Sequence, residues 1–158
     1  MKLLTTEEII EHFGKPNEKG EPYITMIELP YPMRLAWDVN TTIRKMRCHK
    51  LIAQPLLNVF NELLATYGLD AIKRLEIDLF GGCFVYRAMR GGKQLSRHSW
   101  GIAIDLSPAK NDLKTPFDKS QFGGAGYMHL HEIFEKHGFL NYGKVKNYDS
   151  MHFEFCAI

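Results

Sequence analysis

Apolar residues recur at intervals of three and four positions between residues 49 and 68 of the chain. The repeating positions are Leu51, Ile52, Leu56, Leu57, Phe60, Leu63 and Leu64. This spacing is typical of one face of an amphipathic helix, and Gly68 follows it as a C-terminal cap. Pro55 falls in the first two turns, where a proline is tolerated. The pattern therefore predicts a helix that begins near His49.

Two shorter helices are predicted, one at the start of the chain and one in its last third. Thr5 and Glu8 have the form of a capping box, which indicates a helix over residues 6–13. A second helix is expected over residues 127–137, where Gly138 ends the pattern.

Short apolar runs bounded by glycines or turn residues predict the strands. Residues 22–37 hold three prolines among β-formers, which indicates irregular extended structure rather than a helix. The Gly81-Gly82 pair is expected to be a turn between two of the strands. The predicted strands are 75–80, 83–87, 102–106 and 151–156.

The chain of 158 residues, 45% of them hydrophobic, is long enough to bury one core without help from a disulfide or a structural metal. Helices beside short strands predict an α+β fold, with a small antiparallel sheet and flanking helices. We expect a single compact domain over residues 1–158. Within it, residues 1–47 form the first helix and extended segments, packed on a core of residues 48–158 that holds the candidate site.

Charge and cysteine content exclude several classes of protein. The formal charge of +2 is too small to indicate nucleic-acid binding. Cys48, Cys83 and Cys156 are far apart and form no Cys-x-x-Cys pair, which argues against a disulfide framework and a thiolate zinc site. Neither a signal peptide nor a membrane-spanning run is recognisable, so we expect a cytoplasmic protein without membrane insertion.

A histidine and a carboxylate flank a glycine turn in the middle of the chain. In the strand over residues 102–106, side chains alternate between faces, so Ala103 and Asp105 lie opposite the aliphatic residues. His98 precedes this strand across Gly101. Because glycine adopts positive φ readily, a turn at Gly101 would let His98 and Asp105 converge.

A second histidine lies in the C-terminal strand, where His152 and Glu154 share the face opposite two phenylalanines. Two imidazoles and one carboxylate around zinc leave a fourth position for water, which is typical of catalytic zinc sites. We therefore expect one zinc ion bound by His98, Asp105 and His152.

Two acids compete for the role of general base. Asp149 lies three residues before His152 and is the preferred candidate. Strand alternation also places Glu154 on the metal side, and we expect it to orient a ligand without binding the metal.

Arginines near the first histidine are candidates for substrate binding. Arg87 could hold a substrate carboxylate in a bidentate pair, and Arg90 is the alternative. Ser96 could form a hydrogen bond near the ligands or simply belong to a turn. His129 and His131 lie two positions apart on a predicted helix and so point in different directions, which prevents them from sharing an ion.

These residues together form two motifs of a known family. The chain resembles the M15 zinc peptidases, the D-Ala-D-Ala carboxypeptidase and dipeptidase group, and is most similar to the branch with L-alanyl-D-glutamate endopeptidases of phage endolysins. The resemblance covers about residues 87–154. It rests on Ser96-x-His98-x-x-Gly101-x-Ala103-x-Asp105 followed by Asp149-x-x-His152.

The resemblance implies a site, a fold and an activity. It implies zinc ligation by His98, Asp105 and His152, Asp149 as the base, and an arginine such as Arg87 on a substrate carboxylate. The implied fold is the compact one shared by these peptidases and Hedgehog signalling domains.

The implied reaction is hydrolysis of an amide in the stem peptide of bacterial peptidoglycan by zinc-bound water. A phage endolysin without a signal peptide, held in the cytoplasm until release and acting as a monomer, fits this interpretation. The alternatives are a D-alanyl-D-alanine carboxypeptidase or dipeptidase, a bacterial wall-recycling enzyme, and a non-catalytic metal-binding module of the same fold.

Overall fold

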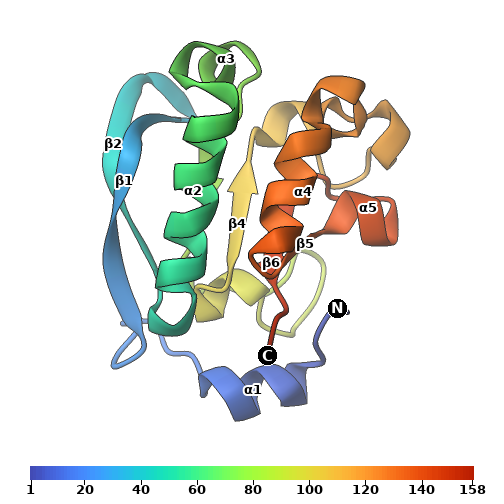
Figure 1. Ribbon diagram of the computed structural model, residues 1–158. Helices are drawn as coiled ribbons and strands as arrows, with labels where there is room; N and C mark the ends of the chain where they lie inside the picture. Colours follow the sequence, from blue (N-terminus) through green and yellow to red (C-terminus); the bar gives the residue numbers. More distant parts are fainter.

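The computed structural model describes residues 1–158 and has a six-stranded sheet in the order β2-β1-β3-β4-β6-β5. Helices α2 and α4 lie next to each other in front of this sheet (Figure 1). The α+β fold class is therefore confirmed. The strands are β1 (Ile24–Leu35), β2 (Asp38–His49), β3 (Leu79–Gly82), β4 (Ala103–Leu106), β5 (Phe139–Asn141) and β6 (His152–Phe155). The helices are α1 (Thr6–Phe13), α2 (Ala53–Tyr67), α3 (Leu69–Arg74), α4 (Met128–Lys136) and α5 (Tyr142–Lys146).

The predicted helices are all present. The capping box of α1 is complete, because the Thr5 hydroxyl accepts from the Glu8 N–H while the Glu8 carboxylate accepts from the Thr5 N–H. Helix α2 begins later than predicted, since a short 3-10 turn (Lys50–Ile52) precedes it and the His49 imidazole accepts the Leu51 N–H.

The prediction of irregular β structure over residues 22–37 is confirmed in kind, because strand β1 occupies most of this segment and its register is interrupted. β1 is a strand of 12 residues, paired with a second long strand, β2, that the sequence pattern did not predict. The prolines of β1 are tolerated because the register shifts between Glu28 and Met33, where ladder hydrogen bonds are interrupted. β2 was missed because most of its side chains are exposed and polar, which leaves no apolar alternation.

The predicted strand over residues 83–87 was wrong, because that segment is a loop. Gly81 and Gly82 belong to β3 instead of forming a turn. A side chain at Gly81 would start 3.1 Å from Asp105 Cβ, so the glycine permits the close approach of β3 to β4. The sheet is mixed rather than wholly antiparallel, since β1 and β3 pair in parallel.

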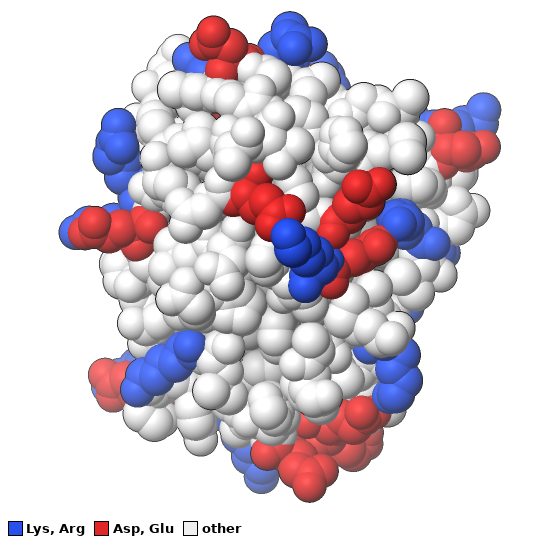
Figure 2. All heavy atoms as spheres, in the orientation of Figure 1, with Lys and Arg blue, Asp and Glu red and all other residues white.

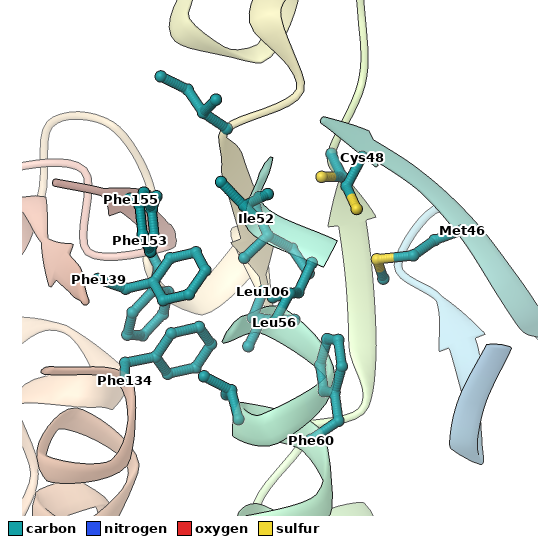
Figure 3. Packing of buried hydrophobic residues seen from close by; sticks show 14 of the residues in the cluster. Met46, Cys48, Ile52, Leu56, Phe60, Leu106, Phe134, Phe139, Phe153 and Phe155 are labelled. Carbon is teal, nitrogen blue, oxygen red and sulfur yellow. The ribbon is translucent and has the colours of Figure 1, made fainter. Parts of the chain in front are cut away.

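The main core fills the space between the helices and the sheet. Figure 3 shows phenylalanines of α4, β5 and β6 gathered beside apolar residues of α2 and β4. Phe134 of α4 stacks on Phe153 of β6 with ring centroids 4.0 Å apart. This packing turns one face of β4 and β6 toward the helices and leaves the other face for polar residues.

Charged side chains on the helix face are interspersed. Figure 2 shows basic and acidic groups next to each other on this face. Lys136 of α4 pairs with Glu62 of α2 at 2.9 Å, and Lys144 of α5 pairs with Glu135 of α4. No helix of the protein combines the length and apolar character that a bilayer crossing needs.

Candidate metal centre

The pairing of β4 with β6 brings the predicted ligands together. In this antiparallel pair, Asp105 lies opposite His152 and Ala103 lies opposite Glu154. All four side chains lie on the sheet face away from the phenylalanine core, as strand alternation predicted. The small side chain of Ala103 leaves room for the longer Glu154.

A tight turn places His98 beside this strand pair. The 3-10 turn Arg97–Trp100 begins at Ser96, whose hydroxyl accepts the His98 N–H at 3.3 Å. It ends at Gly101, which has φ of 69°. A side chain at Gly101 would start 2.8 Å from the Ile24 side chain and 2.9 Å from the His49 nitrogen, so only glycine fits. His98 Nε2 thereby lies 3.1 Å from Asp105 Oδ2.

The environment of His98 leaves one ring nitrogen free for a ligand. Its Nδ1 lies 2.9 Å from the Cys83 carbonyl oxygen, which can only accept a hydrogen bond, so Nδ1 carries the proton. Its Nε2 is buried and faces Asp105 Oδ2 at 3.1 Å without a hydrogen bond, because neither atom then carries a proton. A buried nitrogen lone pair without a donor is unusual in a folded protein, and a metal ion would satisfy it.

His152 is held on both sides by carboxylates. Its Nδ1 lies 3.2 Å from Asp105 Oδ1, and its Nε2 lies 3.0 Å from Glu154 Oε1. Glu154 is completely buried and also accepts the Tyr142 hydroxyl at 2.8 Å. A proton on Nε2 directed at Glu154 leaves the Nδ1 lone pair facing Asp105 and His98.

The electrostatics of the cluster favour a cation. Burial alone would lower the pKa of His152, but hydrogen bonds and charge from Asp105 and Glu154 raise it to about 10. Burial likewise opposes ionisation of Asp105, yet the two histidines hold the pKa of its carboxyl below the usual range. The site thus favours positive charge between its carboxylates.

His98, Asp105 and His152 together could hold a metal ion. One ligand atom from each lies within 4.8 Å of the other two. Two imidazole nitrogens and one carboxylate oxygen suit zinc and leave a coordination position open. The His98 Nε2 lone pair, which faces a carboxylate oxygen of Asp105, and the donor set therefore both fit the predicted metal.

Asp149 lies at the edge of the same cluster. It adopts φ of 58°, in the left-handed region that aspartate tolerates better than most residues. Its carbonyl oxygen accepts the His152 N–H at 3.1 Å, which closes a turn and explains how the three-residue spacing brings the two side chains near each other. Burial raises the pKa of the Asp149 carboxyl, while His152 counteracts this shift.

A cleft of about 280 Å³ opens beside these residues. Both predicted arginines line it, with Arg87 half-buried and Arg90 exposed, and Ser96 lines it as well as capping the turn before His98. Several lining residues were not predicted from the sequence, because neither a motif nor a periodic pattern marks them. These are Met89, Gly91, Gly92, Arg97, Leu113, Tyr142, Tyr148 and Met151.

The remaining histidines lie away from the cleft. His131 is buried in the core, where its Nε2 lies 2.7 Å from the Phe122 carbonyl oxygen. His129 is exposed and lies beside Glu132. The two therefore have separate partners, in agreement with their spacing on α4.

The comparison with protein families matches the part of the chain that holds this site. Residues 90–155 match the model of an M15 peptidase family described as D-alanyl-D-alanine carboxypeptidase. The matched segment contains the three candidate ligands and Asp149. The resemblance to the M15 family is confirmed. Neither the search of curated proteins nor the search of solved structures found a match.

Proposed function

We propose that this protein is a zinc-dependent peptidase that hydrolyses an amide in the stem peptide of bacterial peptidoglycan. The observation that carries the proposal is the convergence of His98, Asp105 and His152 beside Asp149, inside the segment that matches the M15 family. The Nε2 of His98, which faces an Asp105 oxygen without a hydrogen bond, supports a metal at this place.

Three side chains provide the proposed ligand atoms, and hydrogen bonds to two of them fix their orientation. His98 Nε2, one oxygen of Asp105 and His152 Nδ1 are the proposed ligand atoms. Zinc bound there supplies a Lewis acid and lowers the pKa of a coordinated water toward neutrality. Hydrogen bonds from His98 to the Cys83 carbonyl and from His152 to Glu154 fix the two imidazole rings in the orientation that ligation requires.

Asp149 is the proposed general base and acid. Its carboxylate accepts a proton from the attacking water and delivers it to the departing amide nitrogen. Burial raises its pKa above that of an ordinary aspartate, which brings it closer to the working pH and makes both proton transfers easier. The turn that joins Asp149 to His152 holds the base at a constant position relative to the metal.

The arginines on the cleft wall are the proposed anchors for an anionic stem peptide. Arg87 is the preferred candidate because its backbone is fixed on both sides of the residue. Its N–H donates to the Ser99 hydroxyl at 3.0 Å, and its carbonyl oxygen accepts the Ser96 N–H at 2.9 Å. Arg90 lies nearer the exposed end of the same segment and is the alternative.

The proposed bond is the one between L-alanine and D-glutamate, cleaved by a phage endolysin that is held in the cytoplasm before release and acts as a monomer. The family description instead favours removal of a terminal D-alanine, which is the second candidate. Mass spectrometry of digested purified wall distinguishes them. An endopeptidase leaves alanine on the sugar-linked stem, whereas a carboxypeptidase releases free D-alanine.

A further inference from the structure

Arg97 connects the N-terminal residues of the chain to the candidate metal centre. Its side chain is largely buried, with 16% of its surface exposed. One terminal nitrogen of the guanidinium donates to the Thr6 hydroxyl and the other to the Leu4 carbonyl oxygen, each at 3.1 Å. The third nitrogen, Nε, lies 3.7 Å from Glu154 Oε2.

The negative charge of Glu154 is compensated by few groups besides Arg97. Its Oε1 accepts from Tyr142 and His152, but Oε2 is buried and has no hydrogen-bond partner. A buried carboxylate without a counter-charge is strongly unfavourable. Of the basic side chains, only His152 and Arg97 form an ion pair with Glu154, and Arg97 is the permanently charged one.

We propose that Arg97 is a positioning residue for the metal centre, which holds Glu154 against His152 and is itself held by Leu4 and Thr6. The proposal rests on the proposed function in one respect, namely that a metal binds at His98, Asp105 and His152. It adds a role for the N-terminal segment in holding Arg97. Leu4, one of the two residues that contact the guanidinium, precedes Arg97 by 93 positions.

The planar guanidinium explains why arginine suits this place. Its nitrogens point in fixed directions, so two of them contact the N-terminal segment while the third faces the carboxylate. With Arg97 in place, Glu154 stays against His152 Nε2, and the Nδ1 lone pair stays directed at the metal position. Without it, the carboxylate loses its counter-charge and His152 loses a fixed orientation.

The test measures zinc affinity by competition with a chromophoric chelator and the visible spectrum of the cobalt-loaded protein. Loss of an outer partner of a metal ligand typically weakens metal affinity roughly 10- to 100-fold. We expect this loss in Arg97→Met, together with altered cobalt absorption bands, and a smaller loss in Arg97→Lys. Zinc affinity within threefold of the unaltered protein in Arg97→Met would overturn the proposal.

Arg34 provides a matched control for the removal of a paired arginine. It forms two hydrogen bonds of 2.8 Å with the buried Asp78, and neither residue lines the cleft. Arg34→Met should lower the unfolding temperature and leave zinc affinity and the cobalt spectrum unchanged. If Arg34→Met weakened zinc binding as much as Arg97→Met does, the effect would come from a general loss of stability. That result would overturn the positioning role of Arg97.

Thr6 keeps the test decisive if Arg97→Met does not fold. Thr6→Val removes the hydroxyl that holds Arg97 and should weaken zinc binding. Thr6→Ser keeps that hydroxyl and should bind zinc as tightly as the unaltered protein. Equal affinity in the two variants would overturn the link to the N-terminal segment. Absence of zinc binding by the unaltered protein would instead refute the proposed function, so the two failures are distinguishable.

Discussion

Asp105 and His152 are direct partners across β4 and β6, and His152 Nδ1 lies 3.2 Å from Asp105 Oδ1. One residue comes from the middle of the chain and the other from its last strand. Their adjacency in the sheet fixes two of the three candidate metal ligands by backbone pairing alone. Only His98 depends on a separate turn.

Removal of either histidine ligand should abolish zinc binding and turnover. His98→Ala and His152→Ala each leave two ligand atoms, which are too few to hold zinc at a catalytic site. Elemental analysis of the purified variants measures the metal content. His129→Ala is the control, because His129 is exposed and distant from the cleft, and it should keep both zinc and activity. Full activity of either ligand variant would refute the metal centre.

Removal of the proposed base should separate metal binding from turnover. Asp149→Ala is expected to retain close to one zinc per chain and to lose about 10²- to 10⁴-fold in kcat, the usual contribution of general acid–base catalysis. The measurements are elemental analysis and the rate of release of wall peptides. Loss of zinc in this variant would show that Asp149 is a ligand rather than the base.

Substitution of the preferred substrate arginine should affect substrate use alone. Lysine keeps the charge of Arg87 but cannot form the bidentate pair with a carboxylate, so Arg87→Lys should raise KM with little effect on zinc content. Arg90→Lys is the matched variant on the same cleft wall. Normal kinetics in Arg87→Lys combined with a raised KM in Arg90→Lys would transfer the role to Arg90.

Gly101→Ala should destabilise the protein and weaken the site. Alanine at φ of 69° is strained by about 1–2 kcal/mol, and its Cβ would also start 2.8 Å from Ile24. Gly91→Ala is the control, since Gly91 has φ of 72° and nothing lies within 4 Å of an added Cβ. Urea unfolding should show a larger loss of free energy for Gly101→Ala, and equal losses would show that the crowding at Gly101 is unimportant.

The sequence predicted the parts of the structure that depend on local rules. Strand alternation indicated that Asp105, His152 and Glu154 turn away from the core, and positive φ at Gly101 was expected because His98 had to approach Asp105. These rules involve few residues and fixed geometry, so a short motif is sufficient to reveal them.

Other features depend on long-range packing that leaves no local pattern. The contact between Arg97 and Thr6 joins residues 91 positions apart, and neither residue type indicates it. β2 is an edge strand with mostly exposed polar side chains, and the partner strand β1 determines its conformation. The segment after β3 has β-forming residues but lies in a loop, because its backbone groups bond singly to Ser96, His98 and Ser99 rather than to a neighbouring strand.

The central claim is that hydrolysis of peptidoglycan depends on a metal at His98, Asp105 and His152. The most direct measurement is mass analysis of purified wall treated with the protein, with a chelator, and with the chelator followed by zinc. We predict that stem-peptide fragments appear with the untreated protein, disappear with the chelator and return with zinc. The same fragments in the continued presence of the chelator would contradict the claim.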